Sequence, residues 1–76
     1  MITTNQLAAN AIRLAIIRET INGTLTDPVT TALDQLDAWN IHTTDPVTFT
    51  DDELARIVVT GEREASVLAG MQRARA

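Results

Sequence analysis

Few residues of this chain have side chains that catalyse reactions, and their small number limits the chemistry to consider. His42 is the only histidine and Ser66 the only serine, and the chain has no Cys, Lys or Tyr. A Ser–His–Asp arrangement needs the hydroxyl and the imidazole within hydrogen-bond reach, whereas Ser66 falls in a predicted helix and His42 in a predicted loop. The three glycines, Gly23, Gly61 and Gly70, are isolated and form no phosphate-binding loop. We therefore expect a protein that is not an enzyme.

The acidic residues form three groups with ligand chemistry, but none has the spacing of a metal-binding loop. Asp34 with Asp37, His42 with Asp45, and the run 51–53 each place oxygen or nitrogen ligands close together in the sequence. None of them follows the order of Asp, Asn and central Gly that an EF-hand calcium loop requires. The run 51–53 is explained by a helix start, and the pair Asp34 and Asp37 by an exposed helix face. We expect neither a metal ion nor another cofactor.

The charged residues are sorted along the chain, and this order bears on nucleic-acid binding. Residues 1–18 carry two Arg and no acid, residues 19–55 carry eight acids and no Arg, and residues 56–76 carry four Arg and two Glu. A DNA-reading helix needs basic side chains along the phosphates. Only the last segment supplies them, as Arg56, Arg63, Arg73 and Arg75. Because the last two also suit the negative C-terminal end of their own helix, DNA binding is an alternative and not the first hypothesis.

Length and composition predict a single small helical domain over residues 1–76. A domain of this size buries only about 60% of the surface of its unfolded chain, and without Cys it has no disulfide to stabilise it. No apolar run approaches the roughly 18 residues that span a bilayer, and the first residues lack the features of a signal peptide. We expect a soluble, cytoplasmic protein with no membrane partner. The use of Arg without Lys indicates a GC-rich source genome, such as an actinobacterial or phage genome.

A repeated pentapeptide marks the boundaries of the second predicted helix. The sequence TDPVT occupies residues 26–30 and again residues 44–48. In each copy, an Asp that can cap free amides precedes a Pro whose fixed φ suits a first helical turn. The first copy starts a helix at Pro28. The second is followed by a stronger start signal, a capping box formed by Thr50 and Glu53, so we expect this copy to be an extended loop.

The predicted fold class is all-α, a compact bundle of three helices. Their expected ranges are 4–22, 28–40 and 51–73, with Thr3 or Thr4 as the first cap and Gly23 as a left-handed C-cap. Gly61 follows a run of β-branched residues, so a break at this position would give a fourth helix. The alternative is a small α+β domain with short strands at 47–49 and 57–59.

The first and last predicted helices carry more apolar or small surface than a three-helix monomer is expected to cover. On the first helix, Ile16 and Ile17 belong to an apolar arc that is wider than the stripe of an ordinary surface helix. On the last helix, Gly61, Ala65 and Ala69 recur at four-residue intervals and make a ridge that a neighbouring helix can approach closely. These five residues are the predicted partner interface.

These features predict a non-enzymatic protein–protein interaction module. It is expected to self-associate as a homo-oligomer, or to dock on a host or partner protein, through the first and last helices. The basic ends and the acidic middle of the chain can orient such a contact. The two alternatives are a small DNA-binding regulator and a structural subunit of a larger assembly, such as a virion.

Overall fold

Three α-helices form this protein. In the computed structural model, which describes residues 2–75, α1 spans Thr4–Asn22, α2 spans Pro28–Ile41 and α3 spans Asp51–Arg75. The described residues contain no strand, so the all-α prediction is confirmed and the α+β alternative is wrong. Helix α3 continues through Gly61 without a break, and the fourth helix is therefore also absent from this range.

Polar side chains cap the first turns of α1 and α2. At α1, Gln6 N donates to Thr3 Oγ1 at 3.1 Å and Thr3 N donates to Gln6 Oε1 at 2.8 Å, which makes a reciprocal capping box. At α2, Val29 N donates to Asp27 Oδ1 at 3.2 Å, and Pro28 occupies the first helical position. Both helix starts lie where the sequence predicts them.

The start of α3 is a second reciprocal box, formed by Thr50 and Glu53 as predicted. Glu53 N donates to Thr50 Oγ1 at 3.1 Å, and Thr50 N donates to Glu53 Oε1 at 3.0 Å. The pKa of Glu53 lies below its usual value, first because the Thr50 backbone N–H stabilises the carboxylate and second because of the Thr50 hydroxyl. Asp51 and Asp52 add negative charge to the first turn, where it suits the helix dipole.

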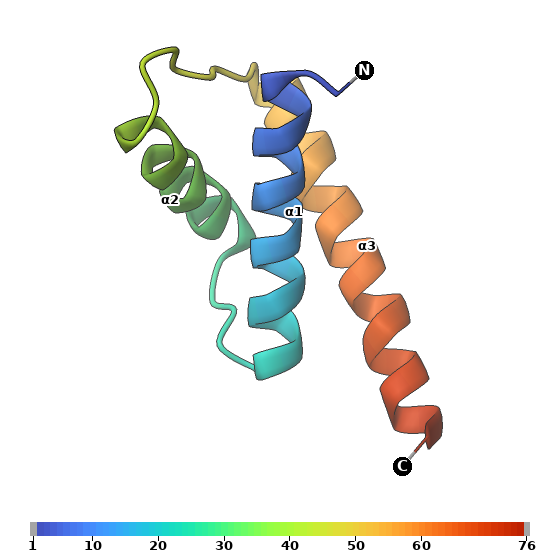
Figure 1. Cartoon of the computed structure of the whole chain (residues 1–76). Helices are drawn as coiled ribbons and strands as arrows, with labels where there is room; N and C mark the ends of the chain where they lie inside the picture. The colour runs from blue at the N-terminus through green and yellow to red at the C-terminus, as the bar shows by residue number, and fades with distance from the viewer. Residues whose placement is uncertain (1, 76) are drawn as a thin grey trace.

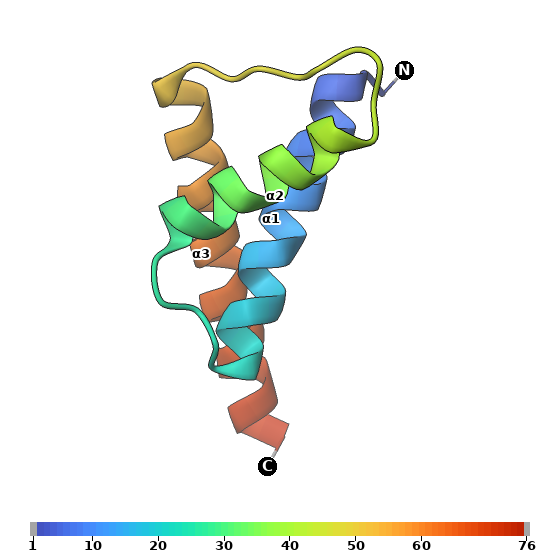
Figure 2. The ribbon, with the colours of Figure 1, turned by 90° about the vertical axis from the view of Figure 1, so that its left-hand side faces the viewer.

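The segment between α2 and α3 crosses one end of the molecule without regular structure (Figures 1 and 2). It contains the second TDPVT copy, as predicted. The Asn40 side chain holds it in place: Oδ1 accepts from Val47 N at 2.9 Å, and Nδ2 donates to Val47 O at 3.0 Å. Val47 is only 3% exposed, so Asn40 supplies partners to two backbone groups that would otherwise be buried without any.

The substitution Asn40→Ala is expected to lower the free energy of unfolding by roughly 1–3 kcal/mol, because it leaves polar groups of Val47 unsatisfied. Urea unfolding followed by circular dichroism measures this change. Asn10→Ala is the matched control, since Asn10 is exposed on α1 and alanine favours a helix. Equal stability of the two variants would show that the Asn40 bonds do not hold the linker.

Helix α1 is central in the bundle. Both α2 and α3 pack mainly on α1, and they contact each other less. Helices α1 and α3 run in the same direction and α2 runs against them (Figure 1). Figure 2 shows α2 crossing the other two helices obliquely, and in both views the C-terminal end of α3 extends beyond the end of α1. The last turns of α3 are therefore not covered by another helix.

The hydrophobic core is small for the length of the chain. Its central cluster is Ile12, Ile16, Ala32 and Val58, with partly buried side chains packed against it: Leu36, Phe49, Leu54 and Ile57. The radius of gyration is 13.1 Å, whereas a compact chain of 76 residues has about 11.4 Å. The bundle is thus elongated, with extents of 45 × 29 × 23 Å.

Candidate functional site

The residues predicted to form a partner interface lie mainly in the contact between α1 and α3 of the same chain. Ile16 is fully buried and Ile17 is 8% exposed. Gly61 and Ala65 are also buried, and Ala69 is half-buried. The part of the apolar arc that holds Ile16 and Ile17 is covered because α2 and α3 both pack on α1. A partner that binds this conformation through α1 and α3 has to use other side chains, on their outer faces.

Gly61 is a point of close approach between α1 and α3. A Cβ added at Gly61 would lie 3.2 Å from Ile16 Cβ and Cγ2, and 3.4 Å from the carbonyl oxygen of Arg13. The Arg13 guanidinium forms an ion pair with Glu64, one turn further along α3. Both contacts join α1 to α3.

Helix α1 exposes a row of large apolar side chains. Leu7, Leu14 and Ile21 follow one another at seven-residue intervals, so they share one face of the helix. Between 39% and 55% of each side chain is exposed. The seven-residue spacing of this row is visible in the sequence. The sequence pattern does not show which side of the apolar arc is covered by other helices.

The second half of α3 exposes three more apolar side chains. Val67, Leu68 and Met71 are 39–59% exposed and are neighbours at three- and four-residue spacing. Val67 and Leu68 line a shallow depression of about 340 Å³ together with Arg63 and Glu64. Because Glu64 pairs with α1, Leu68, one turn later, lies on the side of α3 near α1.

These side chains on the two helices form the candidate binding surface. We call it the α1/α3 surface and define it by six residues: Leu7, Leu14, Ile21, Val67, Leu68 and Met71. Two exposed arginines flank it. Arg18 lies between Leu14 and Ile21 on α1, and Arg63 lies one turn before Val67 on α3. The surface is thus apolar, with Arg18, Arg63 and the Arg13–Glu64 ion pair at its edge.

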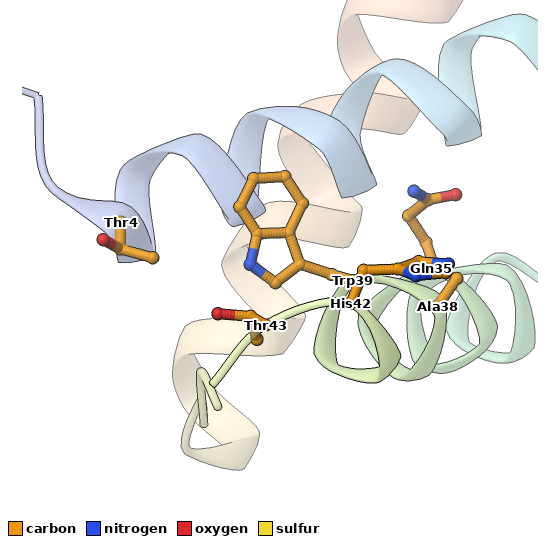
Figure 3. A pocket seen from close by; sticks show the side chains of 6 residues that line it. All are labelled: Thr4, Gln35, Ala38, Trp39, His42 and Thr43. Atoms are coloured by element: carbon orange, nitrogen blue, oxygen red, sulfur yellow. The ribbon is translucent and has the colours of Figure 1, made fainter. Parts of the chain in front are cut away.

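A larger depression lies elsewhere, beside the end of α2. It has a volume of about 540 Å³ and is lined by Thr4, Gln35, Ala38, Trp39, His42 and Thr43. Figure 3 shows the Trp39 indole projecting from α2 toward α1, with Thr43 beside it. His42 is exposed and caps the C-terminal end of α2 through its backbone N–H, which donates to Trp39 O at 3.4 Å. The depression thus has one aromatic wall and several separate polar groups.

The residues considered for catalysis and metal binding are not brought together. His42 is the C-cap of α2, whereas Ser66 lies in the second half of α3. Within residues 2–75, no group of three or more His, Cys, Asp or Glu side chains is placed to hold a metal ion. No helix in the described part of the chain is both long and apolar enough to cross a membrane.

Comparisons with models of protein families, with curated proteins and with solved structures found no match to this chain. The two surfaces described above are therefore the basis for a proposed function. Of these, the α1/α3 surface draws on two helices and combines exposed apolar side chains with charge. The depression at Trp39 is confined to the junction of α2, the linker and the first turn of α1.

Proposed function

We propose that this protein is a non-enzymatic interaction module that binds a protein chain through the α1/α3 surface. The observation that carries the proposal is the exposure of six large apolar side chains on two helices of a domain with a small core. Contiguous apolar surface rimmed by polar residues is typical of protein–protein contacts. In the cell we place this activity in the cytoplasm.

The total surface of the chain supports the proposal. The accessible area is 5441 Å², whereas the scaling of area with mass gives about 4,600 Å² for a folded monomer of 8.3 kDa. Helix α3 extends past the end of α1 (Figure 1), and Leu7, Leu14 and Ile21 of α1 are exposed. Binding of another chain on this face would remove apolar area from water, which is favourable by about 25 cal/mol per Å² before the costs of association.

The DNA-binding alternative has less support. Arg13 is already paired with Glu64, which leaves fewer free basic groups near the α1/α3 surface. Helix α2 exposes Asp34 and Asp37, and acidic side chains on a helix oppose contact with phosphates. Arg63 of α3 serves the proposed function at the edge of an apolar surface.

Photo-crosslinking tests the proposal. A photoreactive amino acid at position 14 or 71 is expected to give adducts with another protein chain, in purified protein or in an extract of the source organism. Position 66 is the control, because Ser66 is exposed and lies about 140° around α3 from Met71. Adducts from all three positions in equal yield, or from none, would contradict a specific surface on α1 and α3.

A further inference from the structure

We infer that the partner of the α1/α3 surface is a second copy of this chain, which presents the outer face of its α2. This inference rests on the proposed function and names its partner. It follows from the chemistry of the two faces and from the area that each copy exposes. Separate experiments test whether the partner is a second copy and whether the α1/α3 surface binds a protein chain.

The outer face of α2 is a second exposed apolar surface, and it is acidic. Val29 and Leu33 lie one turn apart, each close to half exposed, and Ile41 at the end of the helix is 75% exposed. Asp34 and Asp37 are exposed beside them. We define the α2 face by these five residues. An amphipathic helix with acidic flanks is the kind of element that fits an apolar surface with arginines at its edge.

The charges of the two faces decide between the possible contacts. Two α1/α3 surfaces placed against each other would bring Arg18 and Arg63 of both copies together, and like charges across an interface are unfavourable. An α1/α3 surface against an α2 face brings the same arginines toward Asp34 and Asp37. The whole sequence has the same separation of charge: its two ends are basic, and residues 19–55 between them carry eight acids.

This pairing joins two different faces, so the contact between copies is heterologous. Each copy carries both an α1/α3 surface and an α2 face. The accessible area of 5441 Å² exceeds the value for a monomer of this mass by roughly 850 Å², so each copy exposes more surface than an average monomer of its size.

Paired charge reversals test the inference. The double variants Arg18→Glu/Arg63→Glu and Asp34→Arg/Asp37→Arg are each expected to weaken self-association roughly tenfold or more, because each sets like charges against each other. An equimolar mixture of the two is expected to form a dimer again, since the reversed surface of one variant matches the reversed face of the other. Sedimentation velocity measures the species. All four positions are exposed, so circular dichroism should show unchanged helix content.

Three results would overturn the inference. The first is a mixture that stays as monomeric as the separate variants. The second is normal dimerisation of Asp34→Arg/Asp37→Arg alone, which would exclude the α2 face from the contact. The third is loss of the dimer in the control Asp45→Arg/Asp52→Arg, which has the same net charge but keeps both faces.

The proposed function can be tested independently of the second copy. A wild-type chain that stays monomeric, while positions 14 and 71 crosslink to a different protein, would contradict the second copy as partner and support the surface. A monomeric chain with no crosslinks from these positions would contradict both.

Discussion

Replacing Ile16 with alanine is expected to lower the free energy of unfolding by about 2–5 kcal/mol, because the lost methyl and methylene groups leave a cavity in a packed core. Ile16 is fully buried and belongs to the central cluster with Ile12 and Val58. It also faces Gly61 across a close contact of α1 and α3. A domain of 76 residues has a total stability of about 4–11 kcal/mol, so this one change removes a large part of it.

Urea unfolding at fixed protein concentration measures the effect, with Leu14→Ala as the matched control. Leu14 lies on the same helix but is 55% exposed, so its loss should leave the stability of the monomer within about 1 kcal/mol of the wild type. Leu14→Ala is also expected to weaken self-association, whereas Ile16→Ala should affect it only through unfolding. A smaller loss of stability for Ile16→Ala than for Leu14→Ala would contradict the described core.

Replacing Gly61 with leucine is expected to separate α1 from α3. A Cβ at this position already meets Ile16 at 3.2 Å and the Arg13 carbonyl oxygen at 3.4 Å, and three further carbon atoms have no space. Overpacking of a core usually costs about 1–3 kcal/mol, and Ile16, the side chain in tightest contact, belongs to the packed core cluster. We expect thermal unfolding, measured by circular dichroism, to be no longer cooperative.

A pair of alanine substitutions separates this steric effect from helix propensity. Glycine to alanine inside a helix is favourable by roughly 1 kcal/mol, and Gly70→Ala should show part of that gain because nothing lies within 4 Å of the new Cβ. Gly61→Ala should instead destabilise, because Ile16 is held by the core on its other side. Equal stabilisation by both substitutions would show that α1 and α3 are not in close contact at Gly61.

Helix starts could be predicted from the sequence because each depends on neighbouring residues. The capping residues Thr3, Asp27 and Thr50 act on amides within three positions, so the local sequence contains the whole interaction. Gly23 at φ 73° is local in the same way. The predicted C-terminal ends of α2 and α3 were less accurate. Helix α2 continues to Ile41 and α3 to Arg75, because no Gly or Pro ends them at the predicted positions.

The candidate surface could be predicted only in part, because coverage depends on tertiary packing. The width of the apolar arc on α1 is a property of the sequence, but a helical wheel does not show which part α2 and α3 cover. Ile16 and Ile17 lie on the covered part, whereas Leu14 and Ile21 do not. The same limit applies to Gly61, whose small size serves the contact with Ile16 inside one chain.

The central claim is that the chain binds a second copy of itself, and the mass of the purified protein in solution tests it most directly. Light scattering on a sizing column, over a dilution series, is expected to show a species of twice the 8.3 kDa chain mass that dissociates on dilution. A mass of one chain at every concentration would contradict self-association through the α1/α3 surface.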